Sequence, residues 1–433
     1  MSDRRETQIV VIGAGIVGVS SALYLQKAGF AVTLVDRNEP GTGASFGNAG
    51  ALAPHAFVPV NSPSIPKRLL GLLFAGGSPL SLSWSYMPVM LPWLMQFLRH
   101  CTESEVQRIS QAMHSLLARN IEFALPLFRE SGADALMRGG GYLHLYETEA
   151  DYRTLSPEIG LYKRLAPDVE EIGVDEIRSL EPNLAPVFKR ALYFKDALHY
   201  LSPMGVCARM ASHFCAEGGR FVRSNVREIR KVRDGHLSVV AGEEIRADQV
   251  VIAAGAHSMR LGGGTVERLP LDTERGYHVV FGDSGGLISR TCSSATAGFA
   301  MTPMNEGLRC AGMVELAGLD KPPNPSCHAY LERTARRFLP DLPLKSTSSW
   351  MGFRPSFPDA MPVIGRSGRT PEIILAFGHQ HVGMSSGCAT GKIVAAIASG
   401  EPAPIDIAPF SASRFGTGIR RVEAAGPIVP LIL

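Results

Sequence analysis

The stretch QIVVIGAGIVGVSSALYLQKAGFAVTLVD, residues 8–36, decides the fold. Its apolar run at 9–12 predicts a strand, the residues up to Lys27 favour a helix, and the β-branched run at 32–35 predicts a second strand that ends in Asp36. A strand, a glycine-rich turn, a helix and a second strand, in this order, form the βαβ unit that binds dinucleotides.

Each glycine of the turn Gly13-Ala14-Gly15-Ile16-Val17-Gly18 has its own structural role in dinucleotide binding. Gly13 permits the tight turn, Gly15 lets the backbone approach a pyrophosphate, and Gly18 lets the helix pack closely on the strand. The start of the helix offers unpaired N–H groups and a positive dipole end to the phosphates. Asp36 can accept hydrogen bonds from an adenosine ribose, so the sequence predicts an unphosphorylated dinucleotide, NAD or FAD.

The composition describes a globular protein with a substantial core. The chain has 433 residues, 45% hydrophobic and 19% charged, which suits one large or two medium domains. A formal net charge of +3 is too small to indicate nucleic acid as a partner. The seven cysteines form no CxxC pair and are odd in number, which suits a reducing compartment and predicts no metal site.

Two segments bear on membranes. The polar and basic start MSDRRETQ precedes an apolar run, as in a signal peptide, but that run is already the nucleotide fingerprint, so we expect a cytoplasmic protein. Residues 69–98 are rich in Leu, Met and Trp and carry no charge, yet three prolines and a Gly-Gly make them a poor membrane span. They predict either buried elements of a second domain or a surface patch that docks on a partner or on the inner face of the cell membrane.

The remaining chain alternates between two patterns. Helices are predicted at 105–131, 170–181, 203–217, 326–338 and up to residue 399, and strands include 142–146, 249–254, 277–281 and 373–377. Segments 1–62, 199–270 and 347–433 have the α/β nucleotide-binding pattern, whereas 63–198 and 271–346 do not. The sequence therefore predicts an α/β (α+β) protein, with a Rossmann-like nucleotide-binding domain interleaved with a mixed-sheet substrate domain.

Five motifs make the chain resemble the D-amino-acid oxidase superfamily of FAD-dependent oxidoreductases. Within it, the sequence is most similar to bacterial D-amino acid dehydrogenases, D-hydroxyproline dehydrogenases and glycine oxidases. The motifs, which span nearly the whole chain, are the fingerprint 13–36, the loop Ser45–Gly50, the strand end Ala253–Ser258, the pair Gly352–Asp359 and Pro362–Gly365, and the turn Gly378–Gly383. The resemblance selects FAD over NAD.

The resemblance also implies how FAD is held. It places at the cofactor Gly13, Gly15, Ile16, Val17, Gly18, Asp36, Arg37, Ser45, Asn48, Ala49, Gly50, Ala51, Leu52, Val226, Ala254, Gly255, Gly352, Arg354, Gly378, His379, His381, Val382, Gly383 and Met384. The helix after the last turn would stabilise negative charge at N1/C2=O of the reduced flavin. Because Trp350-Met351-Gly352-Phe353 contains no Cys, we expect non-covalent FAD.

The resemblance implies a substrate clamp as well. In amino-acid-oxidising members the Arg of a G-x-R-P motif pairs bidentately with the substrate carboxylate, and here that residue is Arg354. Tyr277 is the matching candidate for a phenolic hydrogen bond to the same carboxylate, and Glu315 is a candidate for a supporting position behind the site. Further candidates beside the flavin are the histidines His55, His199, His379 and His381, as catalytic or lining residues.

The expected reaction is hydride transfer from Cα of a D-amino acid to flavin N5, with D-proline and 4-hydroxy-D-proline among the substrates, and with electrons passed to a quinone or another carrier. The alternative is an oxidase of glycine, sarcosine or another amine that uses O₂ and releases H₂O₂. A non-catalytic FAD-binding subunit of a heteromeric complex is a third possibility, against which Arg354 is evidence.

Overall fold

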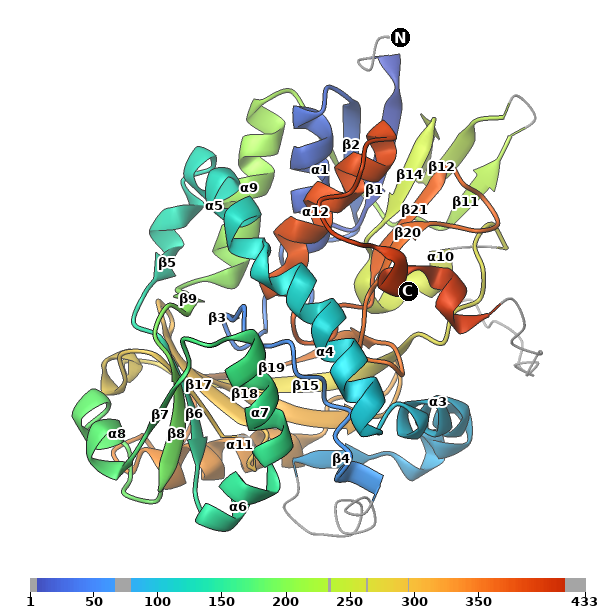
Figure 1. The fold of residues 1–433 in the computed structure, drawn as a ribbon. Helices are drawn as coiled ribbons and strands as arrows, with labels where there is room; N and C mark the ends of the chain where they lie inside the picture. Colours follow the sequence, from blue (N-terminus) through green and yellow to red (C-terminus); the bar gives the residue numbers. More distant parts are fainter. Residues whose placement is uncertain (1–5, 67–78, 233–234, 262–263, 295, 417–433) are drawn as a thin grey trace.

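A computed structural model describes residues 6–66, 79–232, 235–261, 264–294 and 296–416 (Figure 1). The predicted fold class is confirmed, because one large sheet is almost wholly parallel and the other is mixed. The helices are α1 (Ile16–Lys27), α3 (Met87–Arg99), α4 (Glu103–Ala118), α5 (Asn120–Glu130), α6 (Glu149–Thr154), α7 (Ser156–Leu165), α8 (Val174–Leu180), α9 (Pro203–Ala216), α10 (Ser258–Leu261), α11 (Pro325–Phe338) and α12 (Gly383–Ser399).

The first sheet carries the fingerprint. Its strands, in spatial order, are β10 (Arg220–Arg223), β2 (Ala31–Asp36), β1 (Gln8–Ile12), β14 (Gln249–Ile252), β21 (Ile373–Phe377) and β20 (Val363–Arg366), all parallel except β20. Ile9 and Val11 of β1 are buried on one face and Val10 and Ile12 on the other, so the strand has core on both sides. The predicted βαβ unit is confirmed.

Both faces of this sheet are covered. Helices α1 and α12 lie side by side on one face, although 355 residues separate the end of one from the start of the other (Figure 1). A three-stranded antiparallel sheet of β11 (Glu228–Lys231), β12 (Leu237–Ala241) and β13 (Glu243–Ala247) packs on the other. The sheet is thus buried on two sides, and its strand ends remain as the place for a ligand.

The second large sheet is mixed. In order, it contains β19 (Ser348–Ser356), β15 (Asp272–Phe281), β18 (Gly307–Leu316), β17 (Phe299–Met304), β16 (Thr291–Ser294), β6 (Tyr142–Tyr146), β8 (Arg190–Phe194) and β7 (Glu170–Ile172), while β4 (Leu80–Leu82) pairs with β18. On β15, Tyr277 and Val279 pack in a core with α11, whereas the alternate residues Glu274 and Gly276 line a cavity. A short sheet of β3 (Ala51–Leu52), β9 (Leu198–Tyr200) and β5 (Met137–Arg138) lies between the large ones.

Two element predictions are wrong. The single helix expected at 105–131 is two helices, α4 and α5, which meet at Arg119, and the side chain of Asn120 at their junction accepts a hydrogen bond from the backbone of Ala389 on α12 (3.0 Å). The helix expected at 170–181 begins as strand β7, and only α8 after Gly173 is helical. The boundaries of the two predicted domains stay a prediction, although β19, which begins at Ser348 in the predicted nucleotide-binding segment, pairs within the mixed sheet.

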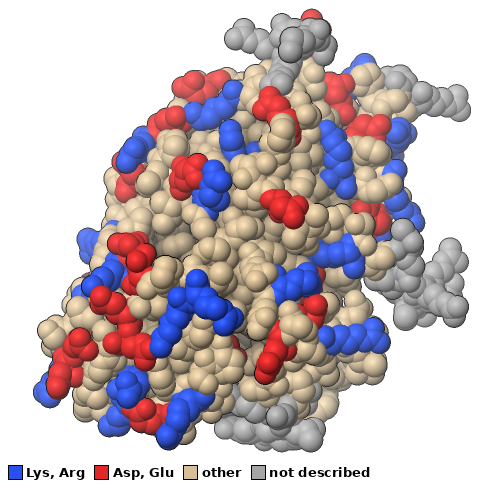
Figure 2. All heavy atoms as spheres, viewed as in Figure 1, with Lys and Arg blue, Asp and Glu red and all other residues tan. Residues whose placement is uncertain are grey.

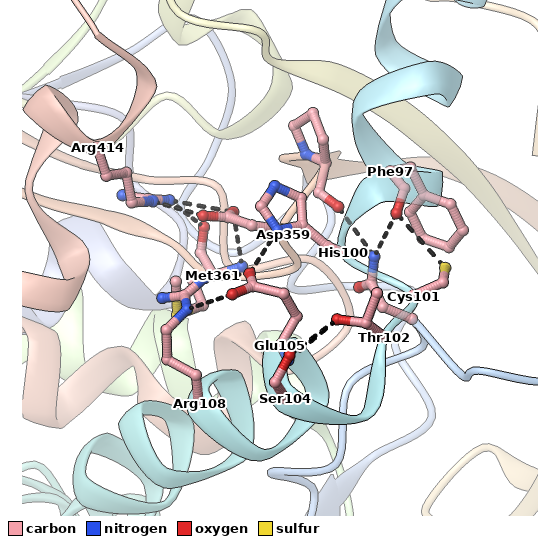
Figure 3. Close-up of polar contacts among 12 residues, drawn as sticks. Phe97, His100, Cys101, Thr102, Ser104, Glu105, Arg108, Asp359, Met361 and Arg414 are labelled. Carbon is pink, nitrogen blue, oxygen red and sulfur yellow. Dashed lines mark hydrogen bonds and ion pairs between the residues drawn. The ribbon is translucent and has the colours of Figure 1, made fainter.

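A polar junction ties the corner between α3 and α4 to the segment that follows β19 (Figure 3), because the side chain of Asn61 donates to the carbonyls of Phe97 (3.3 Å) and Pro358 (3.0 Å). The guanidinium of Arg414 donates to the carboxylate of Asp359 (2.6 Å) and to the carbonyl of Met361 (2.8 Å). At the start of α4, Glu105 binds both His100 (2.7 Å) and Arg108 (2.9 Å). These contacts hold residues 359–361, which follow in sequence the strand that carries Arg354, the predicted substrate clamp.

The uncharged stretch at 69–98 has two faces where it is described; residues 69–78 lie outside the described part. Helix α3 buries Met90, Trp93 and Phe97. Val89, Leu91 and Met95 of the same helix, and Trp84 before it, are exposed. In the described residues no helix is long and apolar enough to cross a membrane. On the face in Figure 2, acidic and basic side chains are intermixed.

Candidate functional site

A cavity of about 770 Å³ extends from the turn between β1 and α1 to the mixed sheet. Its walls come from both large sheets and from the loop that follows β2. Most residues that the sequence assigns to FAD line this one cavity, including Gly13, Gly15, Ile16, Val17, Asp36, Arg37, Ser45, Asn48, Ala49, Gly50, Ala51, Val226, Ala254, Gly255, Gly352, Arg354, Gly378, His379, His381, Val382, Gly383 and Met384. Gly18 and Leu52 are not among the lining residues.

The three glycines of the fingerprint have different constraints. Gly13 has a φ of +109°, and a Cβ there would lie 2.4 Å from the carbonyl oxygen of Ala253. A Cβ on Gly18 would lie 1.7 Å from the carbonyl oxygen of Gly13, which explains why Gly18 packs helix on strand instead of lining the cavity. A Cβ on Gly15 would meet only the hydroxyl of Ser45, at 3.2 Å. The fold therefore requires glycine at positions 13 and 18. At position 15 the fold would accept a side-chain carbon, so glycine there leaves space for a ligand.

The same end of the cavity suits a dinucleotide. The first turn of α1 contains no acidic residue, so its positive dipole end is free to face phosphates. The carboxylate of Asp36 accepts hydrogen bonds from the backbone N–H groups of Ala14 (2.7 Å) and Asn38 (2.9 Å), which fixes it at the end of β2. The residues present therefore fit an elongated dinucleotide with its pyrophosphate at Gly15.

The middle of the cavity is bounded by two stiff backbone segments. In the loop after β2, Asn48 accepts from Gly50 N–H (2.7 Å) and donates to the carbonyl of Ser45 (2.7 Å). In the turn before α12, Gly378 (φ +91°) and Gln380 (φ +45°) are left-handed, and Gln380 N–H donates to the carbonyl of Pro355 (2.9 Å). These contacts fix the backbone at two places in the cavity wall.

Arg354 reaches from β19 across its neighbouring strand β15. Its side chain lies over Gly276, where a Cβ would come within 2.5 Å of the guanidinium. The guanidinium donates to the carbonyls of Met313 (2.8 Å) and Gly312 (3.4 Å) and, within the described part of the chain, to no carboxylate. Burial lowers the pKa of Arg354, and the nearby Glu274 opposes this effect. The result is a fixed cation on the cavity wall whose remaining N–H groups can bind an anion.

Glu274 is a cavity residue that sequence reasoning missed. It pairs with Arg354 in the register of β15 and β19, is only 5% exposed, and accepts a long hydrogen bond from Gln380 (3.4 Å). Burial raises the pKa of this carboxyl, and Arg354 opposes the rise. The alternation of side chains along β15 could have placed Glu274 on the same face as Gly276. The sequence contains no sign that this strand pairs with β19, which brings Glu274 beside Arg354.

The predicted histidines divide into two groups. His55, His379 and His381 line the cavity, whereas His199 does not. Burial lowers the pKa of His55 and of His379 to about 3, and His379 is also hydrogen-bonded to Thr390 (2.9 Å). Although His381 is exposed towards the cavity, desolvation and, second, the charge of Arg354 lower its pKa to about 4. These rings are neutral at pH 7.

Tyr277 does not meet the expectation of a substrate contact. Its side chain is buried on the α11 face of the mixed sheet and is absent from the cavity wall. The hydroxyl donates to Glu315 (2.5 Å) and accepts from the N–H of Asn324 (3.0 Å). Because side chains alternate along β15, Tyr277 faces away from the side that carries Glu274 and Gly276. Glu315, which was expected to support the site, instead binds Tyr277 on the α11 face of the sheet.

Comparisons with known proteins identify the family. The family described as FAD dependent oxidoreductase (DAO) matches residues 8–397. A D-amino-acid oxidase of Bradyrhizobium diazoefficiens is 35% identical over 417 residues, which cover 94% of this chain and 98% of that protein. The match extends through both sheets and the whole cavity.

Two solved structures share the fold. Glycine oxidase from Geobacillus kaustophilus has a TM-score of 0.71 at 21% identity, covering 94% of this chain and 99% of that one. L-Proline dehydrogenase from P. horikoshii has a TM-score of 0.72 at 18% identity, covering 95% and 98%. The family match together with a cavity that fits a dinucleotide leads to one conclusion: the chain belongs to the DAO family of FAD-dependent oxidoreductases, and FAD is its cofactor.

Proposed function

We propose that this oxidoreductase removes hydride from Cα of a D-amino acid and that Arg354 holds the substrate's carboxylate. The observation that carries the proposal is the buried guanidinium of Arg354, fixed on the cavity wall by two carbonyls instead of a carboxylate. A planar guanidinium binds a carboxylate in one orientation through two parallel hydrogen bonds. The D configuration is supported by the relative that is named a D-amino-acid oxidase.

FAD, held along the cavity by the turn at Gly15 and by Asp36, would supply the hydride acceptor, and the imino acid produced from the substrate would be hydrolysed by water to a keto acid. The chain's own contribution is orientation. Arg354 sets the position of the carboxylate, and Glu274, held in the wall opposite it in the strand register, balances the buried positive charge. Because His55, His379 and His381 are neutral at pH 7, the substrate amine meets no cation among them, which suits transfer from a neutral amine.

The electron acceptor has two candidates. A quinone or another carrier, which would make the protein a D-amino acid dehydrogenase, is supported by the exposed apolar side chains Trp84, Val89, Leu91 and Met95, because large exposed apolar groups favour contact with a partner or a membrane surface. The name of the curated relative instead supports O₂ as the acceptor.

Anaerobic reduction of the bound flavin tests the proposal. The purified protein is mixed with D- and L-amino acids without oxygen, and loss of the flavin absorbance is followed before air is admitted. We expect bleaching by D-amino acids. Slow return of the colour in air identifies a dehydrogenase, and fast return with H₂O₂ identifies an oxidase. If no amino acid bleaches the flavin, Arg354 does not serve as the substrate clamp.

A further inference from the structure

One end of the cavity is a pocket of rings, here called the ring pocket and formed by His55, Tyr142, His144, Tyr162, Phe194 and Ser293. The ring of His55 stacks on that of Phe194 (centroids 3.7 Å apart, 8° between planes) and meets the edge of Tyr142 (4.6 Å). The hydroxyl of Ser293 accepts from Tyr142 (2.8 Å) and is hydrogen-bonded to His144 (2.8 Å). Flat apolar walls with a fixed polar group describe a binding site for a ring.

The ring pocket is uncharged. The charged side chains that line the cavity are Asp36, Arg37, Glu39, Glu274 and Arg354, which lie on the fingerprint side or on β15 and β19. Burial lowers the pKa of His55 to about 3 and that of His144 to about 4, so both rings are neutral at pH 7. A charged group that entered the ring pocket would lose its water without gaining an opposite charge.

The ring pocket lies at a distance from the carboxylate clamp. Arg354 donates to the carbonyl of Met313 on β18, whereas Tyr142 and His144 stand on β6. Strands β17 and β16 lie between, so β18 and β6 are three strand spacings apart, about 14 Å. The side chains of Tyr142 and His144 reach Ser293 on β16, which lies one strand closer to the clamp. A ligand that touches both ends needs a side chain of several atoms, and the ring of proline would leave the ring pocket unfilled.

His55 carries a further signal. The side chain is 94% buried (6% exposed), yet neither ring nitrogen has a hydrogen-bond partner among the residues that the structure describes. Buried polar atoms almost always have partners, and a neutral imidazole offers one donor and one acceptor. Since His55 lines the cavity, a hydrogen-bonding group on a ligand can supply this partner.

We infer that the substrate's side chain is an uncharged ring with a hydrogen-bonding group at its tip, of the kind found in D-tyrosine, and that it lies in the ring pocket with this group at His55. The inference rests on the proposed function, because Arg354 must hold the carboxylate for the side chain to point this way. It disfavours D-proline, 4-hydroxy-D-proline and glycine as preferred substrates.

The first test uses the native holoenzyme. We expect kcat/KM for D-tyrosine and D-phenylalanine to exceed that for D-proline, D-aspartate and D-lysine by at least 100-fold, measured as anaerobic flavin reduction. If D-proline or a charged D-amino acid is the best substrate, the inference fails while the proposed function stands. If no amino acid reduces the flavin, both fail.

The second test measures binding without turnover. The compounds 3-(4-hydroxyphenyl)propionate and 3-phenylpropionate lack the amine and cannot be oxidised, and their dissociation constants follow from shifts in the flavin spectrum or from calorimetry. In the native enzyme we expect 3-(4-hydroxyphenyl)propionate to bind about tenfold more tightly than 3-phenylpropionate. In His55→Leu we expect the two compounds to bind equally, and the dissociation constant of 3-phenylpropionate to differ from the native value by less than about threefold. A matched control, His328→Leu, alters a histidine that does not line the cavity and keeps the tenfold preference. If His55→Leu retains the preference, or if glutarate binds better than either ring compound to the native enzyme, the inference is overturned.

Discussion

The most informative perturbation separates two glycines that the fingerprint treats alike. In Gly15→Ala the added Cβ meets only the Ser45 hydroxyl at 3.2 Å, and the backbone is extended (φ −73°, ψ 179°), so we expect the free energy of unfolding to change by less than about 1 kcal/mol. In Gly18→Ala the Cβ would lie 1.7 Å from the carbonyl oxygen of Gly13. Overpacking of this kind lowers the free energy of unfolding by about 1–3 kcal/mol or more.

The two variants should therefore fail in different assays. If the pyrophosphate lies against Gly15, the new methyl group weakens FAD binding by about 1–3 kcal/mol, or roughly 5- to 150-fold in Kd. Fluorescence titration of the apoprotein with FAD measures the Kd, and urea unfolding of the same preparations measures stability. Gly160→Ala on α7 is the control, since its Cβ meets nothing within 4 Å and the position lies outside the cavity wall. Wild-type affinity in Gly15→Ala, or unfolding of that variant, would refute the reasoning.

Three further predictions follow from the contacts. Arg354→Lys keeps the charge but loses the second parallel hydrogen bond, so kcat/KM should fall by about 10- to 150-fold (about 1.5–3 kcal/mol), while Arg366→Lys, outside the cavity wall, stays within about twofold. Asp359→Asn leaves the Arg414 cation buried without its partner, and urea unfolding should show a loss of about 3 kcal/mol; a loss below about 1 kcal/mol would contradict the role of the junction. Hydrogen bonds from Arg108 lower the folded-state pKa of Glu105 from 4.5 to about 2, so its contribution to stability is present above pH 4.5 and is lost as the pH falls towards 2. Glu105→Gln should therefore cost about 1–2 kcal/mol at pH 7 and almost nothing at pH 2, as measured by unfolding at each pH.

The sequence predicted what local patterns control. The fingerprint strands and α1 came out as expected, because the alternation of apolar runs and glycines is complete within residues 8–36. The residues assigned to FAD by motif line one cavity, with Gly18 and Leu52 as the exceptions, because each motif follows the end of a strand or precedes a helix that its local pattern defines. Whether they bind FAD as assigned stays a prediction for the variants above to test.

Features that depend on tertiary pairing could not be predicted. Asn120, at the break between α4 and α5, accepts a hydrogen bond from Ala389 of α12, 269 residues away. Glu274 enters the site because β15 pairs with β19, and Tyr277 leaves it because it faces the opposite side of the same strand. The ring pocket joins β6, β8, β16 and two other segments, and only the spacing of Tyr142 and His144, two residues apart on a predicted strand, pointed to a shared face.

The packing of α1 against α12 has a consequence for synthesis. A ribosome that adds about 5–20 residues per second needs roughly 20–70 s to make the 355 residues between the two helices. During that time the apolar side of α1 and the edges of β1 lack their final neighbours. The nascent chain therefore exposes hydrophobic surface and an unpaired strand edge that chaperones can bind. Residues 376–385, at the end of β21 and the start of α12, form part of the cavity wall, so FAD can be enclosed only after they have been synthesised. Binding of FAD therefore comes late in the folding of the chain.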